Sequence, residues 1–448
     1  MPDRARLAAY DVLTAVRVDD AYTNLVLPAV LQRHRLSGRD AAFATELAAG
    51  TLRRRGTYDA VLATCVDRPL TRVDPGVLDA LRLGAHQLLA MRVPDHAAIS
   101  TSVDLVRTRV GHRPAGFTNA VLRKVSRHDL DAWVRRVAPD PAADPHGFES
   151  VAHAHPRWVV DALGEALAAT DAHGELDALL AADNVSPDVV LVARPGRATR
   201  EELGGTPTRW SPYGAVLDGG DPGEVPAVAA GRAGVQDEGS QLVAIALGRA
   251  AVEGDDRTWL DLCAGPGGKA ALLAGLADEA GARLLAAERA PHRAALVARS
   301  LAGSGGVLGV VAADGTHPAW PPATFDRVLV DAPCTGLGAL RRRPEARWRR
   351  RPEDLDELVV LQRALLGSAL DAARPGGAVL YATCSPVLAE TVGVIDAVLA
   401  ERDDAYADDA AALLPEVPDA GGPRPGTLQL WPHRHGTDAM FLALLRRR

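Results

Sequence analysis

From residue 257 onward, short apolar segments alternate with longer stretches of helical pattern. Five of these segments follow one another along the chain: TWLDL, ARLLAAE, GVLGVVAAD, DRVLVDAP and AVLYATC. Strands that alternate with helices predict an α/β fold, in which a mostly parallel sheet carries helices on both faces. Two further segments, TLQLW and MFLALL, follow an acidic loop rich in proline and glycine at 402–427 and are expected to form an antiparallel edge. We therefore predict one α/β domain over residues 241–448.

The region ahead of this domain has a different pattern. Within residues 4–137 apolar side chains recur at helical spacing, and an all-helical domain is predicted over 1–137; the spacing is clearest at Val77, Leu78, Leu81, Ala85, Leu88 and Leu89. The segment APDPAADPHG has three prolines in ten residues, which predicts a linker without helix or strand over 138–154. Residues 155–240 mix a strand-like DVVLVARP with loops rich in proline and glycine, and predict a small α/β connector.

Composition narrows the class of protein. The 448 residues exceed what a single core usually holds, and no apolar run reaches the ~18 residues of a membrane span. The first residues, MPDRARLAAYDVL, lack the apolar core of a signal peptide, so we expect a cytoplasmic protein. Four scattered cysteines without a CxxC pair favour reduced thiols and no metal.

Charge is unevenly distributed. The net charge is -7, yet residues 1–140 hold 21 basic and 15 acidic side chains. A positive front region favours a polyanionic partner such as nucleic acid. An arginine-rich but merely solvated surface is the other interpretation.

The segment LDLCAGPGGKA at 260–270 ends the first predicted strand with a glycine-rich turn that opens a helix. A doubly wound, Rossmann-like sheet binds nucleotide-like ligands at such a turn. The segment fits neither the P-loop nor the GxGxxG pattern, which disfavours a phosphate ligand. Acids end three successive strands, namely Asp261, Glu288 and Asp314. Glu288 suits ribose hydroxyls and Asp314 the adenine amine, which favours S-adenosyl-L-methionine, although each acid could simply cap the next helix.

Lys269 stands in this turn, and the chain has only two lysines among its 50 basic residues. This scarcity hints that an ammonium group, rather than a guanidinium, is needed there.

Two cysteines follow the fourth and fifth predicted strands, Cys334 in VLVDAPC and Cys384 in VLYATC. Both are expected at the carboxyl edge of the sheet near the cofactor, although a lone cysteine is more often a small buried apolar residue. Carbon 5 of a pyrimidine is too weakly nucleophilic to take a methyl group unaided. A thiolate that adds to carbon 6 makes carbon 5 enamine-like, and elimination later frees product and enzyme. From this chemistry alone, either cysteine qualifies as the nucleophile.

Seven arginines and one tryptophan lie within residues 341–351. Guanidinium groups bind phosphates and an indole stacks on unpaired bases, so nucleic-acid contact is predicted; the candidates are Arg341, Arg342, Arg343, Arg347 and Trp348. The same positive charges would raise the thiolate fraction of a neighbouring cysteine. A solvated helix face is the alternative.

Together these segments resemble the RsmB/Sun type of ribosomal RNA cytosine-C5 methyltransferases, with an NusB-like RNA-binding domain at the front. The resemblance rests on GVQDEGSQL, DLCAGPGGKA, VLVDAPCTGLGALRRRPEARW and YATCSP, and in the front region on RDAAFATELAAGTLRRRG, LRLGAHQLLAMRVPDHAAIS and GFTNAVLRKV. Three departures are visible: Gly265 replaces a more usual alanine, Ala439 a glycine, and Glu390 is not followed by asparagine.

The resemblance implies roles that the residues alone leave open. It makes Cys384 the nucleophile, Cys334 the group that assists product release, and small-subunit ribosomal RNA the substrate of a monomeric enzyme. Asp331 would lie near the cofactor and at the N3 edge of the cytosine. The cofactor contacts would be Cys263, Ala264, Gly265, Pro266, Gly267, Gly268, Lys269, Glu288, Asp314 and Asp331.

Three other functions compete with this interpretation. A DNA cytosine-C5 methyltransferase would use Cys334 as its nucleophile, and the NusB-like front argues for RNA instead. A non-catalytic RNA-binding protein of antitermination type would leave both thiols and the glycine-rich turn unexplained. A nicotinamide-dependent oxidoreductase is disfavoured because the GxGxxG pattern is absent.

Overall fold

The computed structural model describes residues 3–170 and 172–448 and divides into two compact units. The first unit comprises Met1–Asp161, Leu176–Ser186 and Leu340–Arg349. The second comprises Ala162–Glu175, Pro187–Ala339 and Arg350–Arg448. Within the described ranges, no helix combines the length and the apolarity that crossing a membrane requires.

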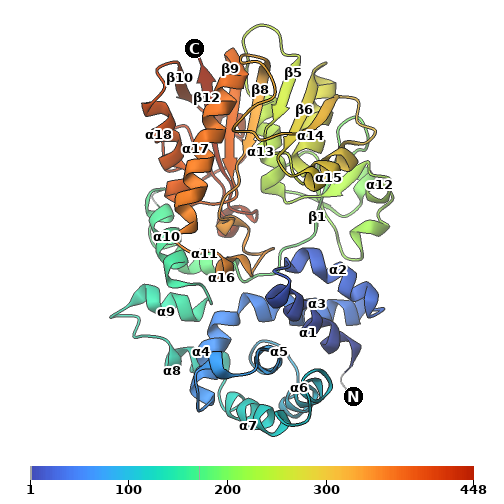
Figure 1. Cartoon of the computed structure of the whole chain (residues 1–448), viewed down its shortest axis with the longest axis vertical. Helices are drawn as coiled ribbons and strands as arrows, with labels where there is room; N and C mark the ends of the chain where they lie inside the picture. Colours follow the sequence, from blue (N-terminus) through green and yellow to red (C-terminus); the bar gives the residue numbers. More distant parts are fainter. Residues whose placement is uncertain (1–2, 171) are drawn as a thin grey trace. The chain divides into compact units, whose positions relative to one another are not determined.

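The front region is helical, as predicted (Figure 1). Its helices are α1 (Arg4–Val18), α2 (Thr23–Arg33), α3 (Gly38–Arg53), α4 (Arg55–Cys65), α5 (Pro75–Leu89), α6 (Asp95–Arg109), α7 (Ala115–Val125) and α8 (Leu130–Val137), with the 3-10 turn η1 (Leu70–Arg72). Beyond this region follow α9 (Pro145–Ala152), α10 (Arg157–Ala168) and α11 (Leu176–Ala182). Helix α5 shows why the pattern folds this way. Asp74 caps it by accepting from the amide of Gly76 at 2.8 Å, and Val77, Leu81 and Ala85 are buried in the core.

The predicted linker is partly helical, which corrects the sequence interpretation. Helix α9 begins at Pro145, where a proline is tolerated because the first helical N–H needs no partner. Asp144 caps the helix by accepting from the amide of Gly147 at 3.0 Å. The prolines of the segment therefore mark the start of a helix as well as a break.

The connector contains a four-stranded antiparallel sheet in the order β2-β3-β1-β4, and the strand predicted at DVVLVARP is confirmed as β1. Its elements are β1 (Val190–Ala193), η2 (Glu201–Leu203), β2 (Thr206–Pro207), β3 (Gly214–Val216), η3 (Pro222–Glu224), α12 (Pro226–Ala229) and β4 (Ala233–Val235). The predicted boundary at residues 240 and 241 falls inside a helix, α13.

The main sheet has the order β10-β12-β9-β8-β5-β6-β7, and β11 also pairs with β12. Its strands are β5 (Thr258–Asp261), β6 (Arg283–Glu288), β7 (Val307–Ala312), β8 (Phe325–Asp331), β9 (Ala373–Thr383), β10 (Ala405–Asp408), β11 (Leu428–Gln429) and β12 (Phe441–Arg447). Strands β5 to β9 are parallel, which confirms the predicted sheet.

The predicted strands TLQLW and MFLALL are confirmed as the antiparallel strands β11 and β12, but the sheet extends one strand beyond them. Strand β12 lies between β9 and β10, so the edge strand β10 comes from the stretch 402–427 that the sequence predicted as loop. Arg446 on β12 pairs with Asp408 on β10 at 2.9 Å, which shows how an acidic segment is accommodated as a strand.

Helices cover both faces of the main sheet (Figure 1). Apolar side chains of α13, α14 and α15 pack on one face, and those of α17 and α18 pack on the other. The bounds are α13 (Glu238–Arg249), α14 (Gly268–Glu279), α15 (Pro291–Leu301), η4 (Leu337–Ala339), α16 (Ala346–Arg349), α17 (Asp354–Ala372), η5 (Leu388–Glu390), α18 (Val392–Ala400), η6 (Ala411–Leu413) and α19 (Pro432–His435). Strand order reverses between β5 and β8, where open α/β sheets bind ligands beyond the carboxyl ends.

Candidate active site at the carboxyl edge of the main sheet

Two thiols meet beyond the carboxyl ends of β8 and β9, next to the point where strand order reverses. Cys384 directly follows β9, and Cys334 comes three residues after the end of the neighbouring parallel strand β8. Their sulfur atoms lie 3.4 Å apart, and both side chains are partly buried. The structure therefore brings together two residues that are 50 positions apart in the sequence.

The surroundings make the two thiols unequal. The hydrogen bond with Cys334 lowers the pKa of Cys384, and the Lys269 ammonium lowers it further, although burial and the charge of Asp331 oppose these effects. The same hydrogen bond, burial and the nearby negative charges of Glu390 and Asp331 raise the pKa of Cys334 well above its usual range. These effects make Cys384 the more acidic thiol of the pair.

Lys269 is the cation whose charge lowers the pKa of Cys384. It lies in the first turn of α14, and its Nζ is 2.9 Å from Asp331 Oδ2 and 3.3 Å from Ser240 Oγ. Burial tends to lower the pKa of Lys269, but the Asp331 carboxylate outweighs it and raises that pKa. The arginine run had been interpreted as the source of positive charge, whereas the charge that acts on Cys384 comes from Lys269.

Glu288 ends β6 and is almost fully buried. Its Oε1 accepts from the amide of Ala290 at 2.9 Å, and Oε2 lies 3.6 Å from a guanidinium nitrogen of Arg293. Gly265 makes room for this carboxylate, because a Cβ there would lie 1.9 Å from Glu288 Oε2. The glycine that departs from the family pattern is therefore matched to the position of Glu288.

Asp314 lies two residues beyond β7 and is partly exposed. Its Oδ1 accepts from the amide of Thr316 at 3.0 Å and from the Thr316 hydroxyl at 2.7 Å, and these bonds lower the pKa of Asp314. These bonds form a local turn and no helix lies in the described stretch between β7 and β8, so Asp314 does not cap a helix, and Oδ2 remains for other contacts, 3.7 Å from Arg289.

Asp261 is the most strongly perturbed acid at this edge. It is fully buried, and burial, followed by the charge of Asp331, raises its pKa to about 7. Oδ1 accepts from the amide of Cys263 at 3.3 Å, whereas Oδ2 has no hydrogen-bond partner among the described residues. An acid with a shifted pKa and an orphaned oxygen is typical of a functional site. The sequence indicated Asp261 only as one acid of three.

The arginine run belongs to the first unit up to Arg349, and one RNA contact predicted there is wrong. Arg347 is completely buried, so it is not available to a phosphate. Its Nη1 donates to Asn184 Oδ1 at 2.9 Å and to the carbonyl of Arg53 at 3.3 Å. Burial lowers the pKa of Arg347 to about 10. Helix α16 uses this side chain to hold neighbouring backbone segments.

The other predicted contacts differ in burial: Arg341 is also buried, at 8% exposure, whereas Arg342, Arg343 and Trp348 are partly exposed. The guanidinium groups of Arg343 and Arg349 lie 5.2 and 4.9 Å from the centre of the Tyr22 ring, and Arg55 lies 5.9 Å from that of Trp348. RNA contact by Arg341, Arg342, Arg343 and Trp348 stays a prediction.

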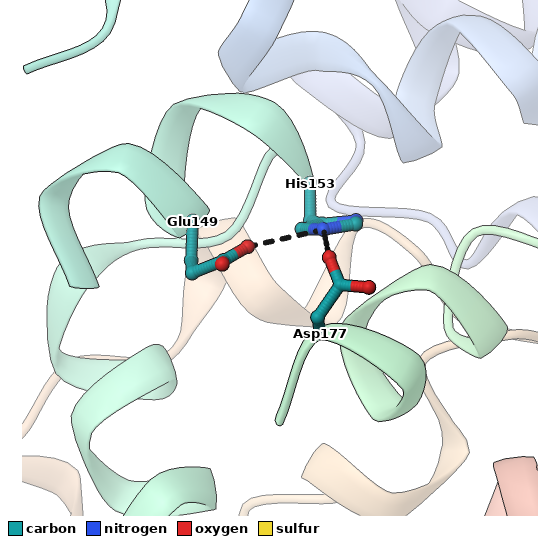
Figure 2. A group of neighbouring side chains, drawn as sticks. All are labelled: Glu149, His153 and Asp177. Atoms are coloured by element: carbon teal, nitrogen blue, oxygen red, sulfur yellow. Dashed lines mark hydrogen bonds and ion pairs between the residues drawn. The ribbon is translucent and has the colours of Figure 1, made fainter. Parts of the chain in front are cut away.

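A separate cluster of polar side chains lies in the first unit (Figure 2). Glu149, His153 and Asp177 present ligand atoms within 4.8 Å of one another. In Figure 2 the two carboxylates approach the same side of the His153 ring, and Nε2 lies 3.1 Å from Glu149 Oε2 and 2.9 Å from Asp177 Oδ1. These ion pairs account for the arrangement, and Asp177 is three-quarters exposed. The expectation of no metal stays a prediction.

Two family models match the chain. Residues 250–446 match the 16S rRNA methyltransferase RsmB/F model, and residues 3–127 match the NusB family. Among solved structures, PH0851 superposes with a TM-score of 0.80 at 22% identity, covering 100% of this chain and 99% of that one. A methyltransferase homolog protein from Pyrococcus horikoshii gives a TM-score of 0.55 at 20% identity over 68% of this chain and 99% of its own. These likenesses show the fold.

Closer relatives extend over the whole chain. Rv1407 of Mycobacterium tuberculosis, named as a methyltransferase, is 54% identical over 99% of this chain and 97% of its own. Ribosomal RNA small subunit methyltransferase B of Pseudomonas syringae pv. tomato is 32% identical over 98% of this chain and 96% of its own. With both family models matched in order and relatives of this similarity, the chain belongs to the RsmB/F family of 16S rRNA methyltransferases and carries an NusB-family domain at its front.

Proposed function

We propose that this protein transfers a methyl group from S-adenosyl-L-methionine to carbon 5 of a cytosine in small-subunit ribosomal RNA. The observation that carries the proposal is the pair of thiols 3.4 Å apart, with the Lys269–Asp331 ion pair beside them at the strand reversal. Methyl transfer to nitrogen or oxygen needs no protein nucleophile, whereas transfer to pyrimidine carbon 5 does. Two cysteines in this setting are otherwise without a role.

The residues at the edge fit the cofactor. Glu288 would accept hydrogen bonds from ribose hydroxyls, and Asp314 Oδ2 would meet the adenine amine. The turn from Cys263 to Lys269 and Asp331 would line the same site. Oδ2 of the buried Asp261 has no hydrogen-bond partner among the described residues, and a polar group of the ligand or an ordered water would supply one. When bound, the cofactor supplies an electrophilic methyl group on its sulfonium.

The chain's own residues then carry the remaining steps. The Cys384 thiolate attacks carbon 6 of the cytosine, and a carbon–sulfur bond forms while carbon 5 gains enamine character. Asp331 lies beside Lys269, where it would meet the N3 edge of the base and stabilise the adduct. After methylation carbon 5 gives its proton to water, the electron pair left behind re-forms the double bond between carbons 5 and 6 as the carbon–sulfur bond breaks, and Cys384 leaves as thiolate. The family resemblance assigns this release to Cys334, and the 3.4 Å between its sulfur and that of Cys384 supports the assignment.

The test is nucleoside analysis after incubation with labelled S-adenosyl-L-methionine. 16S ribosomal RNA should yield labelled 5-methylcytidine, and DNA of the same sequence should yield no labelled product. Labelled 5-methyldeoxycytidine from the DNA would instead favour the DNA methyltransferase. Tight RNA binding without any labelled nucleoside, from naked RNA and from the small subunit, would favour a non-catalytic role.

A further inference from the structure

Glu390 is a carboxylic acid completely buried beside the thiol pair. It ends the 3-10 turn η5, five residues after Ser385. A buried carboxylate is costly unless hydrogen bonds replace its lost water. The hydrogen-bond partners of Glu390 therefore indicate which residues it holds in place.

Four donors converge on its two oxygens. Oε1 accepts from the amide of Thr335 at 2.8 Å and from Gln362 Nε2 at 3.0 Å. Oε2 accepts from the hydroxyl of Thr335 at 2.5 Å and from the hydroxyl of Ser385 at 2.6 Å. Only a carboxylate offers enough acceptor sites on two oxygens for all four donors. Bonds to an ionised acceptor are also stronger than neutral ones.

These donors are the neighbours of the two cysteines. Thr335 directly follows Cys334, and Ser385 directly follows Cys384. The two hydroxyls also lie 3.0 Å from each other. One carboxylate thus fixes the residue after each thiol, on loops that leave two different strands.

Two further bonds brace the same arrangement. Gln362 on α17 donates its Nε2 to the carbonyl of Pro333 at 2.8 Å, so it holds the residue that precedes Cys334. The hydroxyl of Tyr381 on β9 donates to the backbone carbonyl of Glu390 at 2.8 Å. Glu390 is therefore itself held by the strand that leads to Cys384.

We propose that Glu390 is a positioning residue, which acts through Thr335 and Ser385 to keep Cys334 and Cys384 at the separation that covalent methylation needs. This inference rests on the function proposed above. It assigns Glu390 no contact with cofactor or base. An error of about 1 Å in the placement of reacting groups lowers rates by about 100-fold, so loss of the Glu390 hydrogen bonds should slow the reaction markedly.

The test compares Glu390→Ala with a matched buried carboxylate. Asp326 is almost fully buried near the amino end of β8 and accepts from the amides of Arg257 and Thr258 at 2.7 and 2.8 Å. Asp326→Ala therefore removes a similar set of hydrogen bonds at the opposite end of the strand. Both variants should melt at a lower temperature, and only Glu390→Ala should form the RNA adduct about 100-fold more slowly. Cofactor affinity should match wild type in both.

Alkylation of Cys384 by iodoacetamide gives a readout that needs no RNA. Its rate, followed against pH by peptide mapping, should shift to higher pH in Glu390→Ala and stay unshifted in Asp326→Ala, because only the first loosens the thiol pair. Glu390→Gln should recover part of the adduct rate, since its carbonyl oxygen can still accept from the amide of Thr335. If Glu390→Ala fails to fold, Thr335→Val and Ser385→Ala take its place and should show the same shift.

In these two assays the wild-type enzyme distinguishes a failure of the proposed function from a failure of the positioning role of Glu390. A wild-type enzyme without any Cys384-dependent adduct would refute the proposed function, while the alkylation profile would still test the positioning role. Equal losses in the Glu390 and Asp326 variants, or an unshifted alkylation profile in Glu390→Ala, would overturn the role of Glu390.

Discussion

At the scale of single residues, the reactivity of Cys384 depends on two neighbours. The Cys334 sulfur lies 3.4 Å from that of Cys384, within hydrogen-bonding distance, and Lys269 adds a positive charge that lowers the pKa of Cys384. The sequence singled out Lys269 only through the rarity of lysine. It did not link this lysine to Cys384, because the two residues lie 115 positions apart and only the sheet brings their strand ends together.

Removal of that charge should move the pH dependence of the reaction. In Lys269→Met the pKa of Cys384 rises, so the rate of adduct formation should reach its plateau at higher pH than in wild type. The measurement is the rate of single-turnover adduct formation from about pH 6 to about pH 10, a range that brackets the ordinary thiol pKa of about 8.5. Lys124→Met, which removes the chain's other lysine, is the control and should keep the wild-type profile. An unshifted profile in Lys269→Met would refute the role of the ammonium.

Asp261 should make stability fall as pH rises. Its folded pKa of about 7 lies above the unfolded value of about 3.9, so the folded state binds the proton more tightly. This contribution is fully present below the unfolded pKa and is lost as pH rises through the folded pKa. Between pH 5 and pH 8 the cofactor-free wild type should lose on the order of 2 kcal/mol more unfolding free energy than Asp261→Asn. Urea unfolding at both pH values measures the difference, and equal losses would contradict the assignment.

At the scale of elements, the loops after β8 and β9 position the chemistry. Gly338 in η4 donates its amide to the carbonyl of Cys384 at 2.8 Å and accepts from the amide of Ala439 at 2.9 Å. A Cβ at Gly338 would lie 2.1 Å from the carbonyl oxygen of Ala439 and 2.8 Å from that of Cys384. The close approach of three backbone segments explains the glycine, and Ala439 is tolerated opposite it.

Gly338→Ala should therefore displace the Cys384 loop and leave the cofactor site intact. Adduct formation should drop by about 100-fold, because both clashing atoms belong to backbone that cannot swing aside. Calorimetry should show wild-type affinity for S-adenosyl-L-methionine. Gly367→Ala is a suitable control, since a Cβ there meets nothing within 4 Å. Wild-type adduct formation by Gly338→Ala would show that the loop does not depend on this contact.

The sequence predicted correctly those helices and strands that follow from a local pattern of apolar residues. The five parallel strands and the helical front follow from periodicity, and the strand-end positions of both cysteines follow from the strands. The edge strand β10 was missed because its sequence, AYAD in an acidic loop, acquires strand character only by pairing with β12. Helix α9 was missed because Pro145 was interpreted as a breaker, although at the first helical position it favours a start.

At the scale of the whole molecule, arginines that are free to bind RNA must be distinguished from arginines whose buried hydrogen bonds stabilise the fold. The arginine run contains a completely buried arginine, Arg347, and a count of charges does not distinguish it from the partly exposed ones. Arg347 is buried among backbone carbonyls of Arg53, Ala154 and Asp183, whereas Arg343 is partly exposed. Burial depends on residues from three distant stretches of the chain, so no local sequence pattern revealed it.

These two arginines should therefore respond differently to substitution. Arg347→Ala should lower the unfolding free energy by at least about 2 kcal/mol, because several buried carbonyls lose their donor. Arg343→Ala should leave stability nearly unchanged and reduce the slope of log affinity against log salt by about 1, as expected for one lost phosphate contact. RNA-binding titrations at several salt concentrations, with thermal melts, measure both. An Arg347→Ala protein of full stability with a reduced salt slope would reverse the assignment.

The account as a whole depends on which thiol bonds to the base. RNA that carries the target cytosine is incubated with S-adenosyl-L-methionine and each cysteine variant, and the products are separated on a denaturing gel. Cys384→Ala should show no protein–RNA band, because it lacks the nucleophile. Cys334→Ala should accumulate a persistent band, because it can attack and methylate but eliminates slowly. A persistent band from Cys384→Ala with none from Cys334→Ala would contradict the account and assign the attack to the loop after β8.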